Sequence, residues 1–237
     1  IVPKKKKKID NIEVKVGNTN YSIGSKVKNL TSDDGTSVNV VVTFADISYH
    51  VIYDNNGGAL QDDSSTNPNS ITMVENILVE HPVKNGYTFN GWNVVSGDVT
   101  IVGDVSGKDK ISLNTTGNVK LVALWVSNKY TLVYKNTVYG TCYYDKSCNL
   151  NDLDNVPSGK EFVHWSLNNN ALGDVVYNLS SVNNDRLDIE PVFNNITYNV
   201  IYKYNGGEAV NTAKYNVDTE SILLNDPVKT GYDFSGW

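Results

Sequence analysis

Two cysteines are the side chains best placed for covalent chemistry, at positions 142 and 148. Between them lies Asp145-Lys146, a pair suited to a hairpin turn that would set Cys142 and Cys148 near each other across two strands. We expect a local disulfide, a bond that persists in an oxidising compartment. A disulfide closing so short a loop would stabilise the fold modestly. Two free buried thiols are the alternative. Two cysteines alone cannot form a zinc site, and no pair of histidines has ligand spacing.

The histidines and paired acids do not form a catalytic or metal-binding pattern. His50, His81 and His164 stand apart, and no nucleophile, histidine and acid occur in the arrangement of a triad or elbow motif. Asp33-Asp34 and Asp62-Asp63 lack the spacing of a calcium loop, so solvated turns are the favoured interpretation. We expect no enzyme activity, no metal site and no cofactor.

Two clusters could contact a partner. Tyr139, Tyr143 and Tyr144 form the one aromatic cluster outside the recurring motifs, and tyrosine is enriched in recognition surfaces. We expect an exposed ligand patch there, with local hairpin packing as the alternative. The run Lys4 to Lys8 could contact anionic wall polymers or membranes, although a solvated linker or edge strand is favoured.

The composition indicates that strands and turns, rather than long helices, position these groups. The 237 residues include 15 tyrosines and 18 glycines but one methionine, a profile that favours strands and turns. The net charge of -6 argues against nucleic acid as a partner. No window approaches the ~18 apolar residues of a membrane span.

Three segments of the sequence open alike. Tyr49–Tyr53, Tyr130–Tyr134 and Tyr198–Tyr202 each place two tyrosines and an aliphatic residue at alternate positions, on one face of a strand. The first and third continue into Asn55–Gly58 and Tyr204–Gly207, whose Asn-Gly pairs predict tight turns.

A second block recurs after each opening. Pro82–Trp92 matches Pro227–Trp237, both ending in Gly-Tyr-x-Phe-x-Gly-Trp, and a degraded copy occupies Pro157–Trp165. Aliphatic strands ending in Phe44, Trp125 and Phe193 then close the units, and each closing aromatic precedes the next opening tyrosine by five residues. This constant step predicts tandem units: 1–46 as the C-terminal part of a preceding unit, 47–127, a divergent unit at 128–195, and 196–237 as the N-terminal part of a further one. We therefore expect the sequence to be a fragment of a longer protein.

These motifs resemble the Listeria–Bacteroides repeat, the family that includes the B repeat of internalin B. The resemblance implies a small β-grasp-like (α+β) unit in extracellular, secreted or wall-attached bacterial proteins, where it serves as a stalk, spacer or adhesion module. Neighbouring repeats of the parent protein are the implied partners. Two alternatives remain open: a self-assembling filament or surface-layer subunit, and direct binding of a host protein or glycan by the divergent unit.

Small units need aromatic residues to fill a modest core. We expect mostly β structure, a hairpin within 94–120, and at most short helices, around 179–185 or over 70–79, where a strand is equally expected. The predicted core residues are Tyr53, Tyr87, Phe89, Trp92, Trp125, Phe162, Trp165 and Phe193.

Overall fold

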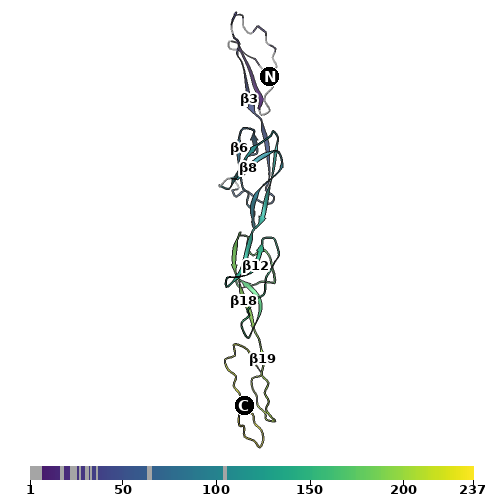
Figure 1. Cartoon of the computed structure of the whole chain (residues 1–237), viewed down its shortest axis with the longest axis vertical. Coiled ribbons are helices and arrows are strands. Elements are labelled where there is room, and N and C mark those ends of the chain that lie inside the picture. The colour runs from purple at the N-terminus through teal and green to yellow at the C-terminus, as the bar shows by residue number, and fades with distance from the viewer. Residues whose placement is uncertain are drawn as a thin grey trace. The chain divides into compact units, whose positions relative to one another are not determined.

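The computed structural model describes residues 7–16, 19–21, 26, 28–29, 32, 34–35, 37–62, 66–103 and 106–237. The chain forms two compact units, residues 1–126 and 127–237. The described residues form strands and no helix (Figure 1). The expectation of a mostly β protein is therefore confirmed. No described helix has the length and hydrophobicity needed to cross a membrane.

The N-terminal segment (residues 7–46) is a three-stranded antiparallel sheet. Its strands are β1 (Lys7–Val16), β2 (Thr19–Tyr21) and β3 (Val40–Asp46), in the order β2-β1-β3. The register shifts between Ile9 and Asn11, where Ile9 lies opposite Phe44 and Asn11 opposite Thr43. One residue of β1 is therefore bulged at this point.

The first segment (residues 48–127) contains two sheets. Strands β5 (Ser70–Thr72), β4 (Ser48–Asp54), β10 (Val119–Ser127) and β7 (Tyr87–Ser96) form one sheet in that order. Strands β6 (Asn76–Glu80), β9 (Lys108–Leu113) and β8 (Val99–Gly103) form the other. The β8–β9 pairing is antiparallel and confirms the hairpin predicted within 94–120.

Parallel pairing of β4 with β10 closes the first segment, with Val51 opposite Val119 and Tyr53 opposite Leu121. Residues of β10 alternate between buried and more exposed as far as Leu124, because successive side chains of a strand point to opposite faces. The buried core consists of Val51, Ile71, Ile77, Val79, Trp92, Ile111, Leu113, Val119, Leu121 and Ala123.

The middle segment (residues 128–195) repeats the parallel closure with shorter strands. Strands β12 (Thr137–Tyr143), β11 (Lys129–Tyr134) and β17 (Asp185–Asp188) form one sheet, in which β11 and β17 run parallel. Strands β15 (Asn170–Ala171), β14 (Lys160–Leu167) and β18 (Glu190–Asn195) form a second, and β13 (Cys148–Asn149) pairs with β16 (Val175–Val176). Its buried core includes Tyr130, Leu132, Tyr139, Cys142, Cys148, Leu153, Trp165, Val176 and Ile189.

The last segment (residues 198–237) has one short antiparallel pair, β19 (Tyr198–Asn199) and β20 (Lys214–Tyr215). After β19 it is drawn almost entirely as a plain trace (Figure 1). Trp237 has 51% of its surface exposed.

Neither stretch considered for a short helix is helical. Residues 70–79 contribute β5 and part of β6, the strand alternative, and 179–184 are irregular. In the irregular stretch the Leu179 amide donates to the Tyr130 hydroxyl, and the Ser180 hydroxyl donates to Asp185. These hydrogen bonds outside the helical pattern hold the chain in its irregular path.

Candidate functional site

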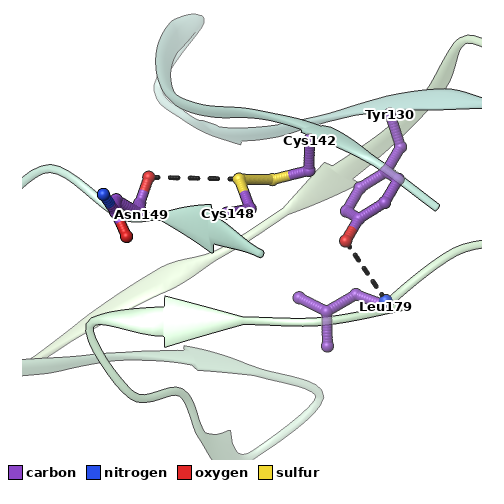
Figure 2. Close-up of a disulfide and its surroundings, with 5 residues drawn as sticks. All are labelled: Tyr130, Cys142, Cys148, Asn149 and Leu179. Carbon is purple, nitrogen blue, oxygen red and sulfur yellow. Dashed lines mark hydrogen bonds between the residues drawn. A yellow bond between two sulfur atoms is a disulfide. The ribbon is translucent and has the colours of Figure 1, made fainter. Parts of the chain in front are cut away.

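A disulfide joins Cys142, in β12, to Cys148, in β13, so the structure brings the two predicted partners together (Figure 2). Their Cα atoms lie 5.2 Å apart. The turn between them is made by Asp145, whose φ is 55°, and the Lys146 amide donates to the Tyr143 carbonyl over 3.1 Å. Both cysteines are buried, and the Cys148 sulfur lies 3.9 Å from the Asn149 carbonyl oxygen.

The disulfide hairpin is fixed to a segment distant in sequence. The Asp145 amide donates to Asn178 Oδ1 over 2.6 Å, and Asn178 Nδ2 donates back to Asp145 Oδ1 over 2.9 Å. Cys148 also lies opposite Val176 in the β13–β16 pair. The hairpin is therefore held by a covalent bond, a reciprocal Asp–Asn pair and a short ladder, which makes it a rigid part of the fold.

The predicted tyrosine patch is wrong for Tyr139, which is 7% exposed. Its ring lies 4.4 Å from that of Trp165, between centroids. The cause is a bulge: Leu132 pairs with Gly140 and Val133 with Val138, so Tyr139 is the extra residue. A bulge interrupts the alternation of faces along a strand, and Tyr139 lies on the buried side. Tyr143 is exposed and Tyr144 half-buried, so the three tyrosines do not share one exposed surface.

A second site lies in the first segment, where the recurring motifs meet. A cavity of about 420 Å³ is lined by His81, Lys84, Tyr87, Phe89 and Trp125, among others. Lys84 Nζ lies 4.4 Å from the centre of the Tyr87 ring and 5.9 Å from that of Trp125. Lysine over aromatic faces is a favourable cation–π arrangement.

Two residues that line this cavity, Trp125 and Lys84, also bind the Asn-Gly-Gly turn. Trp125 Nε1 donates to the Asn55 carbonyl over 3.1 Å, and Lys84 Nζ donates to the Asn56 carbonyl over 3.3 Å. A Cβ atom at Gly58 would lie 2.5 Å from the Trp125 ring. Glycine is therefore required at this position so that the closing tryptophan can lie against the turn.

Ionisable residues line the same cavity, among them Glu80, His81 and Lys108. His81 Nε2 lies 3.2 Å from Oδ1 of the buried Asp109, and Lys108 Nζ lies 2.9 Å from Glu80 Oε1. The His81 ring also lies 4.6 Å from that of Phe89. These contacts connect β6 and the residue after it to β9 and to Phe89 of the recurring block. The ionisable side chains therefore mainly stabilise the first segment.

The remaining candidate residues lie apart from both sites. His50 is exposed on β4, while His164 is half-buried on β14. Asp34 and Asp62 are exposed, and Asp33, Asp63 and Lys4 to Lys6 lie outside the described residues. Within the described ranges, no group of three or more His, Cys, Asp or Glu side chains could hold a metal ion.

Seven of the eight predicted core aromatics belong to the two cores or pack against them. Tyr87 does not, and lies under Lys84 instead. Trp92 and Trp165 are buried; the half-buried ones are Tyr53, Tyr87, Phe89, Trp125, Phe162 and Phe193. The rings of Tyr53 and Phe89 lie 5.7 and 5.3 Å from Trp92, between centroids. Burial raises the pKa of the Tyr53 hydroxyl above its ordinary value, and this hydroxyl donates to the Pro68 carbonyl over 2.7 Å.

The motif geometry of the first segment recurs around the same residues of the last. Lys229 lies 4.5 Å from the centre of the Tyr232 ring and donates to the Asn205 carbonyl over 2.9 Å, as Lys84 does to its own tyrosine and turn.

The family model of the Listeria-Bacteroides repeat domain matches residues 49–123 and 198–237. These two segments are Listeria-Bacteroides repeats. The suspected family is thus confirmed, and it is a family found in bacterial surface proteins. No curated protein and no solved structure matched the chain.

Three residues that contribute to these sites were given no role from the sequence. Lys84 and Lys229 recur within the matching blocks, and that recurrence was the available signal. Tyr130 is fully buried, and its hydroxyl accepts from the Leu179 amide (Figure 2). Only its place as an opening tyrosine marked it in the sequence.

Proposed function

We propose that the chain is part of an extracellular bacterial surface protein, in which tandem repeats act as a stalk or spacer. The family match supports a surface protein. The parallel pairing of the opening strand with a later strand, seen in 47–127 and in 128–195, supports a spacer.

The parallel pairing carries the proposal because it fixes where the chain enters and leaves a repeat. β4 and β10 run parallel in the first segment, and β11 runs parallel to β17, the strand just before the last strand β18, in the middle one. A chain whose opening strand runs parallel to a strand near its end enters at one end of that sheet and is directed toward the other. Each repeat then adds length between its neighbours, which is what a spacer requires.

The same pairing supports the finer proposal of a β-grasp-like unit at 47–127 and 128–195. In both segments the opening strand lies between a parallel and an antiparallel partner. In this proposal the described strands and loops supply the whole unit without a helix.

We also propose that the chain has no catalytic role. Its ionisable groups serve packing contacts, such as those of His81 with Asp109 and of Asp145 with Asn178. The disulfide, whose formation needs an oxidising compartment, supports the extracellular location. Labelling of intact cells with antibodies against the chain tests that location, and labelling only after permeabilisation would contradict it.

Small-angle X-ray scattering tests the spacer directly. One variant lacks residues 128–195; the deletion keeps the five-residue step from the closing aromatic Trp125 to the next opening tyrosine, Tyr198. The matched control carries a second copy of 128–195 inserted after residue 195. We expect the maximum dimension to shrink or grow by roughly 35 Å, since the strand residues 185–195 rise about 3.3 Å each. An unchanged maximum dimension in both variants would contradict the spacer.

A further inference from the structure

The stretch by which the chain enters the first segment lies against the stretch by which it leaves. Residues 51–54 of β4 pair in parallel with residues 119–122 of β10. Just before these pairs, the His50 amide donates to Asn118 Oδ1 over 3.0 Å. The contact between the two stretches therefore begins one residue ahead of the strand ladder.

Side chains continue this contact past the end of the ladder. Asn56 Nδ2 donates to the Ala123 carbonyl over 3.1 Å, and Trp125 Nε1 donates to the Asn55 carbonyl over 3.1 Å. Hydrogen bonds thus join the stretch 50–56 to the stretch 118–125 along almost the whole length of both.

One face of this contact is closed to water. Val119, Leu121 and Ala123 of β10 are each 1% exposed or less, and Val51 of β4 belongs to the same buried core. A hydrogen bond beside an apolar core is stronger than one in water, because water molecules do not compete for its partners. The core therefore protects the contact between the two strands.

The parallel direction decides how a pull acts on this contact. The chain enters β4 at Ser48 and leaves β10 at Ser127. Because parallel strands share one direction, these two points lie at opposite ends of the pair, and a pull on both slides the strands along each other. All hydrogen bonds between the strands then share the force and break together. A pull on both strands at the same end would break the bonds one after another.

The middle segment has the same arrangement, although the family model does not match it. β11 and β17 pair in parallel over four positions. Backbone hydrogen bonds lengthen this contact at both ends: the Asn184 amide donates to the Lys129 carbonyl over 2.6 Å, and the Ile189 amide to the Val133 carbonyl over 2.9 Å. The arrangement therefore recurs in a segment whose sequence is divergent.

We propose that the β4–β10 pair, with its flanking hydrogen bonds, is a clamp that keeps the first segment folded while the chain is under tension. The use of this clamp rests on the proposed stalk, because a stalk between a cell and its surroundings is pulled along its length. Resistance to that pull goes beyond the spacer role, since a spacer by itself needs only to add distance.

Single-molecule pulling on the full chain tests the clamp by changing the direction of the force. Ser48→Cys with Val126→Cys places the two handles at opposite ends of the pair, and Ser48→Cys with Thr116→Cys places both at the same end. All three positions are exposed. Cys142 and Cys148 are bonded to each other, so under non-reducing conditions the handles attach to the new cysteines.

We expect pulling at opposite ends to need several times the force of pulling at the same end, at equal pulling speed, because forced unfolding is governed by the barrier to rupture. Each rupture should lengthen the tether by up to roughly 3.5 Å per residue between the handles, which identifies unfolding of the first segment. Both variants should unfold at the same urea concentration, since their folded states are the same. Equal rupture forces in the two directions would overturn the proposal.

The substitution Asn56→Gly gives a second readout at the far end of the clamp. Glycine tolerates the φ of 49° found at Asn56, but it removes the side chain that donates to the Ala123 carbonyl. Added to each pair of handles, it should lower the opposite-end force by a larger fraction than the same-end force, because same-end rupture begins near His50. An equal fractional loss would contradict the place of Asn56 in the clamp.

The clamp and the spacer fail in different experiments. Scattering measures the length that a repeat adds in the absence of force, and pulling measures the resistance of one segment. Equal forces in the two directions therefore refute the clamp and leave the scattering result unchanged. An unchanged maximum dimension refutes the spacer and leaves the two forces as measured.

Discussion

The tryptophan of the Gly-Trp block has the same aromatic neighbours in the first and last segments. Trp92 lies 5.7 and 5.3 Å from the rings of Tyr53 and Phe89, and Trp237 lies 5.6 and 5.7 Å from those of Tyr202 and Phe234. Yet Trp92 is 7% exposed and Trp237 51%. The short-range sequence therefore specifies the contacts, and the closing strand β10 with the β6-β9-β8 sheet supplies the burial.

This comparison separates local from long-range stabilisation. A motif can form its turn and ring contacts from nearby residues, but the hydrophobic gain depends on the apolar area that is removed from water. The first segment thus has a core around its motif, and the last has the motif without the core.

The largest expected difference concerns the two tryptophans. Trp92→Ala should cost about 3–5 kcal/mol of unfolding free energy, as for a large buried aromatic, and Trp237→Ala should cost much less because half of its ring is already in water. Urea unfolding followed by fluorescence and amide exchange of each segment measures both. Equal losses would break the comparison.

The disulfide sharpens the comparison in the middle segment, which the family model does not match. Replacing Cys142 and Cys148 together by alanine should lower its stability by about 2 kcal/mol, the value for a loop this short in the chain-entropy model. The first segment should be unaffected, which amide exchange of β4 and β10 will show. A loss shared by both segments would contradict this assignment.

The two lysines test how much the motif contributes by itself. Lys84→Met keeps the aliphatic stem but removes the ammonium over Tyr87, and should cost roughly 0.5–1 kcal/mol. Lys229→Met should cost less, because Tyr232 is exposed and its site is open to water. Thermal unfolding combined with amide hydrogen exchange of each segment compares the two variants. A larger loss of stability for Lys229→Met than for Lys84→Met would show that the cavity around Lys84 does not strengthen the lysine–tyrosine contact.

The smallest effect at neutral pH is expected for Tyr53→Phe, about 0.5–1 kcal/mol for the lost hydrogen bond. The folded state holds the Tyr53 proton more tightly than the unfolded chain, because burial raises its pKa. Its contribution is therefore fully present below the ordinary tyrosine pKa of about 10 and is lost as the pH rises above it. Melting of both proteins across this range should show a shallower alkaline decline for the variant; parallel curves would contradict the buried hydroxyl.

The sequence was informative where the structure follows from residues close together. The Asn-Gly turns, the aromatic block and the Asp145 turn that brings Cys142 to Cys148 all depend on short-range chemistry. Tyr139 was misplaced because its bulge is defined only when β12 pairs with β11. The path of 179–184 likewise depends on a hydrogen bond to the distant Tyr130, and single-sequence patterns do not show such partners.

Hydrogen exchange at two equivalent amides tests the central claim most directly. The Val51 amide donates to the Asn69 carbonyl and the Val200 amide to the Ala213 carbonyl, both over 2.9 Å. If the closing strand determines stability, Val51 should exchange only on unfolding of the segment, while Val200 should exchange faster by orders of magnitude. Equal protection of the two amides would contradict the account, because it would mean that the motif alone is enough.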